Sequence, residues 1–62
     1  SLLSGREITV AQLVGQGASN KEVARQLDIA ERTVKAHLTA IFEKLQVRDR
    51  LQLSLRINGV RD

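Results

Sequence analysis

The residues best suited to chemistry lie in a stretch of mixed cationic and small side chains between residues 31 and 40. Arg32 and Lys35 carry N–H donors that can bind guanine O6 and N7 in the major groove of DNA. Ala36 and Thr39 are small, so a helix that bears them can seat deeply, and their methyl groups can touch thymine methyls. This set predicts contacts to DNA bases by Lys35, Ala36, Thr39 and Arg32.

A second group of polar residues is suited to the phosphates of a DNA backbone. The backbone N–H groups of Asn20 and Lys21 stand at a predicted helix start, which favours an anion, and Arg25 follows on the same segment. Each cation taken singly is read more simply as a solubilising surface charge, and His37 as a packing residue or a phosphate contact rather than a catalytic group. Gathered around two adjacent helices, they favour DNA. The predicted backbone contacts are Ser19, Asn20, Lys21, Arg25, Thr33 and His37.

The same chain offers little to an enzyme or to a metal site. His37 is the only histidine and there is no cysteine, so no nucleophile, base and orienting group can be assembled around them. Glu7 lies toward the apolar side of its segment, where we expect an ion pair with an Arg or Lys from a later helix. Gly15 and Gly17 are predicted to end the first helix, since glycine accepts the left-handed backbone of a helix C-terminus. They follow a helix rather than a strand, which indicates a turn and not a phosphate-binding loop. We therefore expect no enzymatic activity, no cofactor and no metal.

Helices must position these residues, and three capping boxes mark where helices begin. In each box a short polar side chain accepts from a backbone N–H, and a Glu or Gln three residues later reaches back. The boxes are Ser4–Glu7, Ser19–Glu22 and Asp49–Gln52. The chain has no proline and one aromatic residue, and it is rich in residues that favour helix. The predicted fold class is all-α, with helices near residues 5–15, 20–27, 31–45 and 50–58.

The second and third predicted helices have the features of a helix-turn-helix. Ala24 supplies a small residue where the two helices cross, and Asp28 tolerates the left-handed backbone that the tight turn requires. Apolar residues at the offsets needed to lock the pair are Val23, Leu27, Ile29 and Val34. An ordinary αα-hairpin is the alternative, and the polar residues described above favour the helix-turn-helix.

Length and charge limit the remaining possibilities. Sixty-two residues make one small domain with a thin core, and ten Lys and Arg against seven Asp and Glu give a net charge of +3. No apolar stretch approaches the roughly 20 residues of a membrane span, and no signal-peptide core is present. We expect a cytoplasmic protein, a single domain over residues 1–62 that is a fragment of a longer chain, and fraying over residues 60–62.

The fourth predicted helix is apolar on two sides. Leu51 and Leu55 share one side, and Leu53 and Ile57 share the other. A helix that is apolar on both sides is buried on both sides. In a four-helix chain of this size, one of the two sides is expected to meet another molecule.

Four stretches of the chain resemble the LuxR/NarL/FixJ-type (GerE-like) domain of transcription regulators. They are residues Leu3–Glu7, Gly17–Ala24, Leu27–His37 and Lys44–Arg50, and the resemblance extends from Leu3 to about Ile57. It implies a C-terminal four-helix domain that binds DNA, controlled by an N-terminal receiver or ligand-binding domain as in response regulators and quorum-sensing regulators. It also implies that residues 31–45 form the recognition helix, with base contacts at Lys35, Ala36 and Thr39 and in some members Arg32. A homodimer on an inverted-repeat site, paired through the fourth helix, is implied as well. This agrees with the two apolar sides of that helix, and the predicted dimer interface is Leu51, Leu53, Leu55 and Ile57.

Three departures from the family pattern affect this expectation. Ala30 stands where the family usually has a capping Ser or Thr, and Thr39 reaches fewer groups than a lysine would. The fourth helix is also richer in leucine than usual. Two alternatives to a dimeric regulator remain: a promoter-binding module like that of a sigma factor, which would be monomeric on DNA, and a helical protein-interaction domain, which would show no salt-dependent binding to a duplex.

Overall fold

The computed structural model describes residues 2–59 and forms four helices joined by short connections. They are α1 (Gly5–Gly15), α2 (Asn20–Leu27), α3 (Glu31–Leu45) and α4 (Arg50–Asn58). The all-α prediction and the four predicted ranges are confirmed, whereas residues 60–62, expected to fray, lie outside the described part. None of the helices formed by residues 2–59 is long and apolar enough to cross a membrane.

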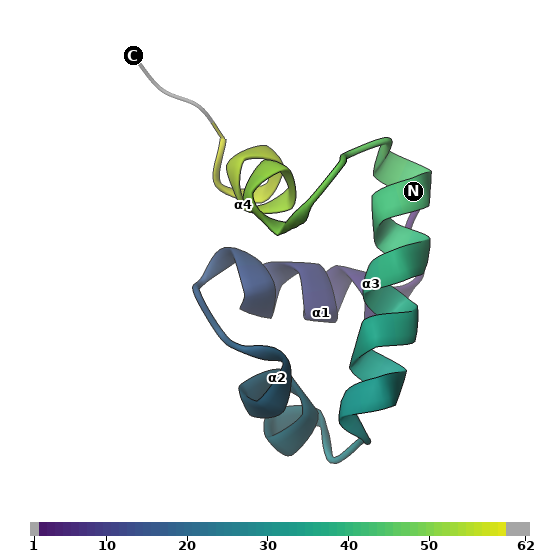
Figure 1. The fold of residues 1–62 in the computed structure, drawn as a ribbon, viewed down its shortest axis with the longest axis vertical. Coiled ribbons are helices and arrows are strands. Elements are labelled where there is room, and N and C mark those ends of the chain that lie inside the picture. The colour runs from purple at the N-terminus through teal and green to yellow at the C-terminus, as the bar shows by residue number, and fades with distance from the viewer. Residues whose placement is uncertain (1, 60–62) are drawn as a thin grey trace.

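The helices pack around one small core. Helix α1 lies between α2 and α4, and the longest helix, α3, runs along one side of that group (Figure 1). All four helices contribute to the core, because each presents an apolar stripe to the others. The buried apolar residues are Val10, Ala11 and Val14 from α1, Val23 and Ala24 from α2, Val34, Leu38 and Ile41 from α3, and Leu53 from α4.

The first two capping boxes form as predicted. Ser4 Oγ accepts from the Glu7 N–H at 3.2 Å, and the Ser4 N–H donates to Glu7 Oε1 at 2.9 Å. Ser19 and Glu22 repeat both bonds at the start of α2. At α4 only the first bond of the box is present among the described residues, from the Gln52 N–H to Asp49 Oδ1. Each bond satisfies an N–H group that the helix start leaves without an intrahelical partner.

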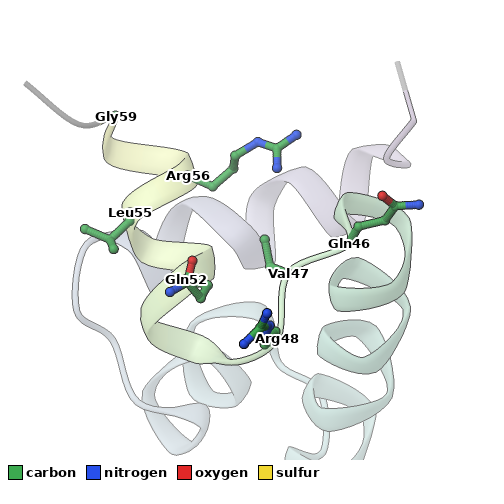
Figure 2. A pocket seen from close by; sticks show the side chains of 7 residues that line it. All are labelled: Gln46, Val47, Arg48, Gln52, Leu55, Arg56 and Gly59. Atoms are coloured by element: carbon green, nitrogen blue, oxygen red, sulfur yellow. The ribbon is translucent and has the colours of Figure 1, made fainter.

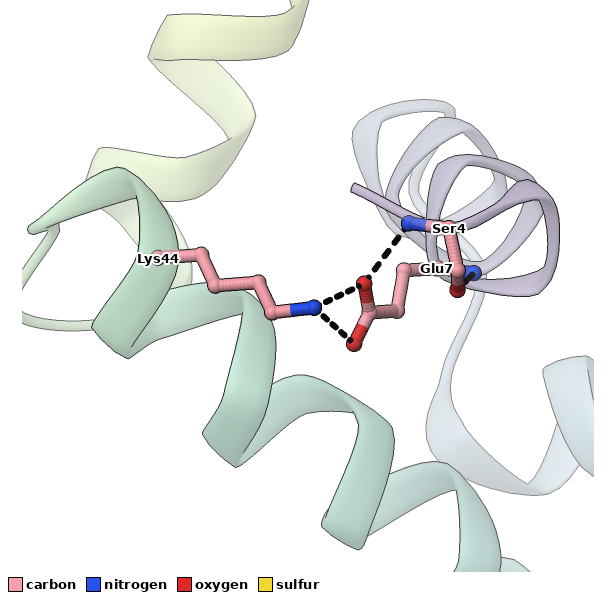
Figure 3. A network of polar contacts seen from close by, with 3 residues as sticks. All are labelled: Ser4, Glu7 and Lys44. Carbon is pink, nitrogen blue, oxygen red and sulfur yellow. Dashed lines mark hydrogen bonds and ion pairs between the residues drawn. The ribbon is translucent and has the colours of Figure 1, made fainter. Parts of the chain in front are cut away.

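Glu7 also forms the predicted ion pair, and its partner is Lys44 in the last turn of α3 (Figure 3). Lys44 Nζ lies 2.8 Å from Glu7 Oε1 and 3.1 Å from Oε2. The Lys44 hydrogen bonds, with the Ser4 N–H, lower the pKa of the Glu7 carboxyl below its ordinary value. The ion pair links the start of α1 to the end of α3 and so helps to hold α3 in place.

The connection after α1 differs from expectation at one glycine. Gly17 takes the left-handed backbone, with φ of +98°, but Gly15 is the last helical residue and has no such φ. The prediction that both glycines serve this purpose is therefore wrong for Gly15. An added Cβ there would lie 2.8 Å from Ile57 Cγ2, so Gly15 is instead the point where α4 approaches α1 closely. Asn58 completes the contact by donating to the Gly15 carbonyl oxygen at 2.8 Å.

The two apolar sides of α4 have different surroundings. Leu53 has no exposed surface and belongs to the chain's own core, so the prediction that it forms a dimer interface is wrong. Ile57, half-buried, packs against the same core. Leu51 and Leu55, by contrast, are 65% and 43% exposed. Periodicity showed two apolar sides, and burial identifies the side that faces inward.

Candidate nucleic-acid interface

Helices α2 and α3 form the predicted helix-turn-helix. The turn between them is tight because Asp28 adopts the left-handed conformation, with φ of +58°, and the Ile29 N–H donates to the Ala24 carbonyl oxygen. Val23 and Val34 are fully buried between the helices, and Ala24 is 7% exposed. These contacts fix the angle between α2 and α3, so that the outward face of α3 is held rigidly from behind.

The outward face of α3 carries the four residues predicted to contact bases. Arg32, Lys35, Ala36 and Thr39 are all exposed. Thr39 Oγ1 donates to the Lys35 carbonyl oxygen at 3.1 Å, so its hydroxyl hydrogen is engaged within the helix. The face therefore offers two long cationic side chains beside two short ones.

The flanking residues predicted to contact a DNA backbone differ in how exposed they are. Lys21 and Arg25 are exposed on α2, whereas Thr33 and His37 are half-buried on the flank of α3. Ser19 is exposed, but its hydroxyl oxygen accepts from the Glu22 N–H as the cap of α2. Bonds from the Ser19 backbone and side chain lower the pKa of the Glu22 carboxyl below its ordinary value.

Asn20 is bonded to a residue that the sequence analysis did not single out. Arg50, the first residue of α4, donates from Nη1 to Asn20 Oδ1 and from Nη2 to the Ala18 carbonyl oxygen, both at 2.6 Å. This guanidinium joins the start of α4 to the start of α2. No local pattern shows the contact, because the residues are 30 and 32 positions apart and meet only in the folded chain.

The start of α3 is uncapped, as its sequence indicates. Ala30 has the extended backbone of a capping residue, with φ of −74° and ψ of 151°, but it makes no side-chain cap hydrogen bond. Two N–H groups near this end do bond to the Ala30 carbonyl oxygen, those of Thr33 and Val34.

Two hollows flank the connection between α3 and α4. The larger, of about 500 Å³, lies between the end of α3 and the side of α4 (Figure 2). Arg56 spans it by donating to the Leu45 carbonyl oxygen at 3.2 Å, and Leu55 and Val47 supply apolar surface. The smaller, of about 360 Å³, opens beside the outward face of α3 and has Lys35 and Thr39 in its wall. Arg48 lines both hollows.

Comparison with known protein sequences identifies the family of the chain. The family model described as bacterial regulatory proteins of the luxR family matches residues 1–56. A glycerol metabolism activator from Pseudomonas putida is 47% identical over 58 residues, covering 94% of this chain and 26% of the relative. A putative HTH-type transcriptional regulator, YhjB, of Escherichia coli K12 is 39% identical over 56 residues, covering 90% of this chain and 28% of the relative.

The nitrate/nitrite response regulator protein NarL of Escherichia coli K12 is 36% identical over 59 residues, which are 95% of this chain and 27% of that protein. The chain thus spans about a quarter of the length of the curated relatives it matches. No solved structure gives a significant match.

Proposed function

Because the chain belongs to the luxR family of bacterial regulatory proteins, we propose that it is the DNA-binding part of a transcription regulator and reads a specific DNA sequence through α3. The observation that carries this proposal is the exposed face of α3, where cationic and small residues are held rigidly by the core behind them. A helix of this kind fits the major groove, which is about 12 Å wide.

In this proposal the residues of α3 make different contacts with the bases. Lys35 donates to a base, and Arg32 donates nearer the start of the helix. Ala36 and Thr39 allow close approach to the groove floor, and their methyl groups meet thymine methyls. Thr39 contributes its methyl group more than its hydroxyl hydrogen, because that hydrogen is bonded to the Lys35 carbonyl oxygen.

The backbone contacts surround this face. Lys21 and Arg25 neutralise phosphates from α2, and Ser19 and Asn20 offer backbone N–H groups at the start of that helix. Thr33 and His37 approach the opposite strand from the flank of α3. Binding then releases counterions, so affinity falls with salt by about 0.9 log units per log unit for each phosphate neutralised.

We place the dimer contact on the exposed side of α4. Leu51 and Leu55 offer apolar surface to a second copy, while Leu53 holds α4 in its own domain. Two copies would read the halves of an inverted repeat spaced by roughly one helical turn, about 10 bp. Control would come from a receiver or ligand-binding domain of the same regulator, which the greater length of the relatives supports.

Selection of bound sites from random duplexes tests this proposal. The wild-type chain is expected to enrich a two-fold symmetric sequence, whereas Lys35→Ala loses about 1–3 kcal/mol and relaxes the preference at one base pair in each half. Arg6→Ala, at an exposed cation on α1, is the matched control and keeps the wild-type preference. Enrichment of no sequence, or an equal loss by Lys35→Ala on every sequence, would contradict base recognition by this face.

A further inference from the structure

The smaller hollow is a basic site beside the outward face of α3. Three cations line it, Lys35 from α3, Arg48 from the α3–α4 connection and Arg50 from α4. Asp49 is the one acid in its lining, and its Oδ1 accepts from the Gln52 N–H at the start of α4. The charge of the lining therefore favours an anion.

Arg50 gives this hollow a fixed positive charge. Its guanidinium is part-buried and held by two hydrogen bonds of 2.6 Å, one to Asn20 Oδ1 and one to the Ala18 carbonyl oxygen. Both acceptors are neutral, so neither cancels the charge of the guanidinium. A cation positioned in this way, without a carboxylate on it, lowers the free energy of an anion placed nearby.

Arg48 is the lining cation whose side chain can change conformation. It is exposed and lines both hollows, of which Figure 2 shows the larger. No side chain or carbonyl among residues 2–59 accepts a hydrogen bond from its guanidinium. A guanidinium binds phosphate oxygens with two parallel N–H donors. Arg48 can therefore turn toward an anion seated in the smaller hollow without breaking a bond in the chain.

The position of the hollow indicates which anion would reach it. Lys35 and Thr39 belong both to its wall and to the outward face of α3, so the hollow opens directly along one flank of that helix. An α-helix with its side chains is about 10–12 Å across and nearly fills a major groove, which places a phosphate backbone along each flank. The start of α2, through Asn20, borders the same hollow.

We propose that this hollow seats one phosphate of the DNA backbone, bound by Arg48 and attracted by the fixed charge of Arg50. The inference rests on the proposed function, since it takes α3 to lie in a major groove. It adds a phosphate contact from the α3–α4 connection to those of α2. Because Arg50 also bonds to Asn20, the two contacts are joined and would follow the same strand.

Salt dependence of binding tests the role of Arg48. The 62-residue chain and its Arg48→Gln variant are titrated against one fluorescent duplex over a range of salt, with Arg6→Gln as the control for loss of an exposed cation elsewhere. We expect the slope of log affinity against log salt to shrink by about 0.9 in Arg48→Gln. The Arg6→Gln slope should equal that of the wild type, and thermal unfolding should show that both variants remain folded.

Neutralising single phosphates identifies the contact itself. In a series of duplexes that each carry one methylphosphonate, the wild type should lose affinity at a position that Arg48→Gln no longer senses. If Arg48→Gln keeps the wild-type slope and the whole methylphosphonate pattern, the hollow holds no phosphate, although DNA binding stands. If the wild type itself shows no salt-dependent binding to any duplex, the proposed function fails instead.

Discussion

Replacing Gly15 with alanine tests the closest approach between α1 and α4. Two effects of opposite sign compete at this position. Alanine is favoured over glycine within a helix by roughly 0.5–1 kcal/mol, which alone would stabilise the chain. The added Cβ, however, would lie 2.8 Å from Ile57 Cγ2 and 3.2 Å from Ile57 Cβ. Carbon atoms pack best at about 3.5–4.0 Å, so α4 or its side chain would have to move by roughly 0.7 Å or more.

Ile57 cannot easily absorb that movement. It is β-branched, and one χ1 rotamer is strongly preferred in a helix, so its methyl group cannot swing aside without strain. Overpacking of this kind costs about 1–3 kcal/mol, which exceeds the gain in helix propensity. We expect Gly15→Ala to destabilise the chain by about 1–2 kcal/mol, with Tm falling by about 4–8 °C for each kcal/mol.

Thermal unfolding followed by circular dichroism measures this effect, and Gly5→Ala is the matched control. A Cβ added at Gly5, in the same helix, meets no atom within 4 Å, so that variant should lose no stability. In an Ile57→Ala background the cost of Gly15→Ala should shrink, because Cγ2 is gone. Stabilisation by Gly15→Ala equal to that by Gly5→Ala would show that α4 is not held against α1 as described.

Three further outcomes are expected. Ala30→Ser should raise the free energy of unfolding by about 0.5–2 kcal/mol in urea titrations, because it caps the start of α3; an unchanged midpoint would mean that solvent already satisfies those N–H groups. Glu7→Gln should flatten the pH dependence of stability: the lowered pKa of Glu7 means that its contribution is present above the ordinary pKa of a Glu side chain and is lost as pH falls through the folded-state pKa. Denaturation at a series of acid pH values checks this, and a slope equal to that of the wild type would remove Glu7 as a cause. Leu51→Ser should weaken pairing of two copies on an inverted-repeat duplex, measured by sedimentation, while Tm changes little; a large fall in Tm would place Leu51 in the core.

The sequence predicts the helices well because the signals that start and stop them are local. Ser4 and Ser19 form their boxes within three residues, and Asp28 takes its left-handed conformation within one turn. The outward placement of Lys35 likewise follows from the helical period, which puts the apolar residues of α3 on the opposite side. Caps, turns and helical periodicity are set by residues close together in the sequence, so they depend little on how the helices pack.

What the sequence could not predict depends on contacts between distant segments. Gly15 reads as a helix terminator, yet its role is set by Ile57, more than forty residues later in the chain. Leu53 and Leu51 are equivalent by periodicity, and only the docking of α4 on α1 decides which is buried. Arg50 carries no local signal for its bonds to Asn20 and Ala18. The basic hollow beside α3 exists only because these segments meet.

Entry of α3 into a DNA groove is tested most directly by an NMR titration of the 62-residue chain with duplex at low ionic strength. We predict that the amide resonances of residues 32–39 shift furthest, accompanied by those at the start of α2, while the α1 resonances of residues 8–14 move little. Resonances of residues 32–39 that stay in place as duplex is added would contradict it.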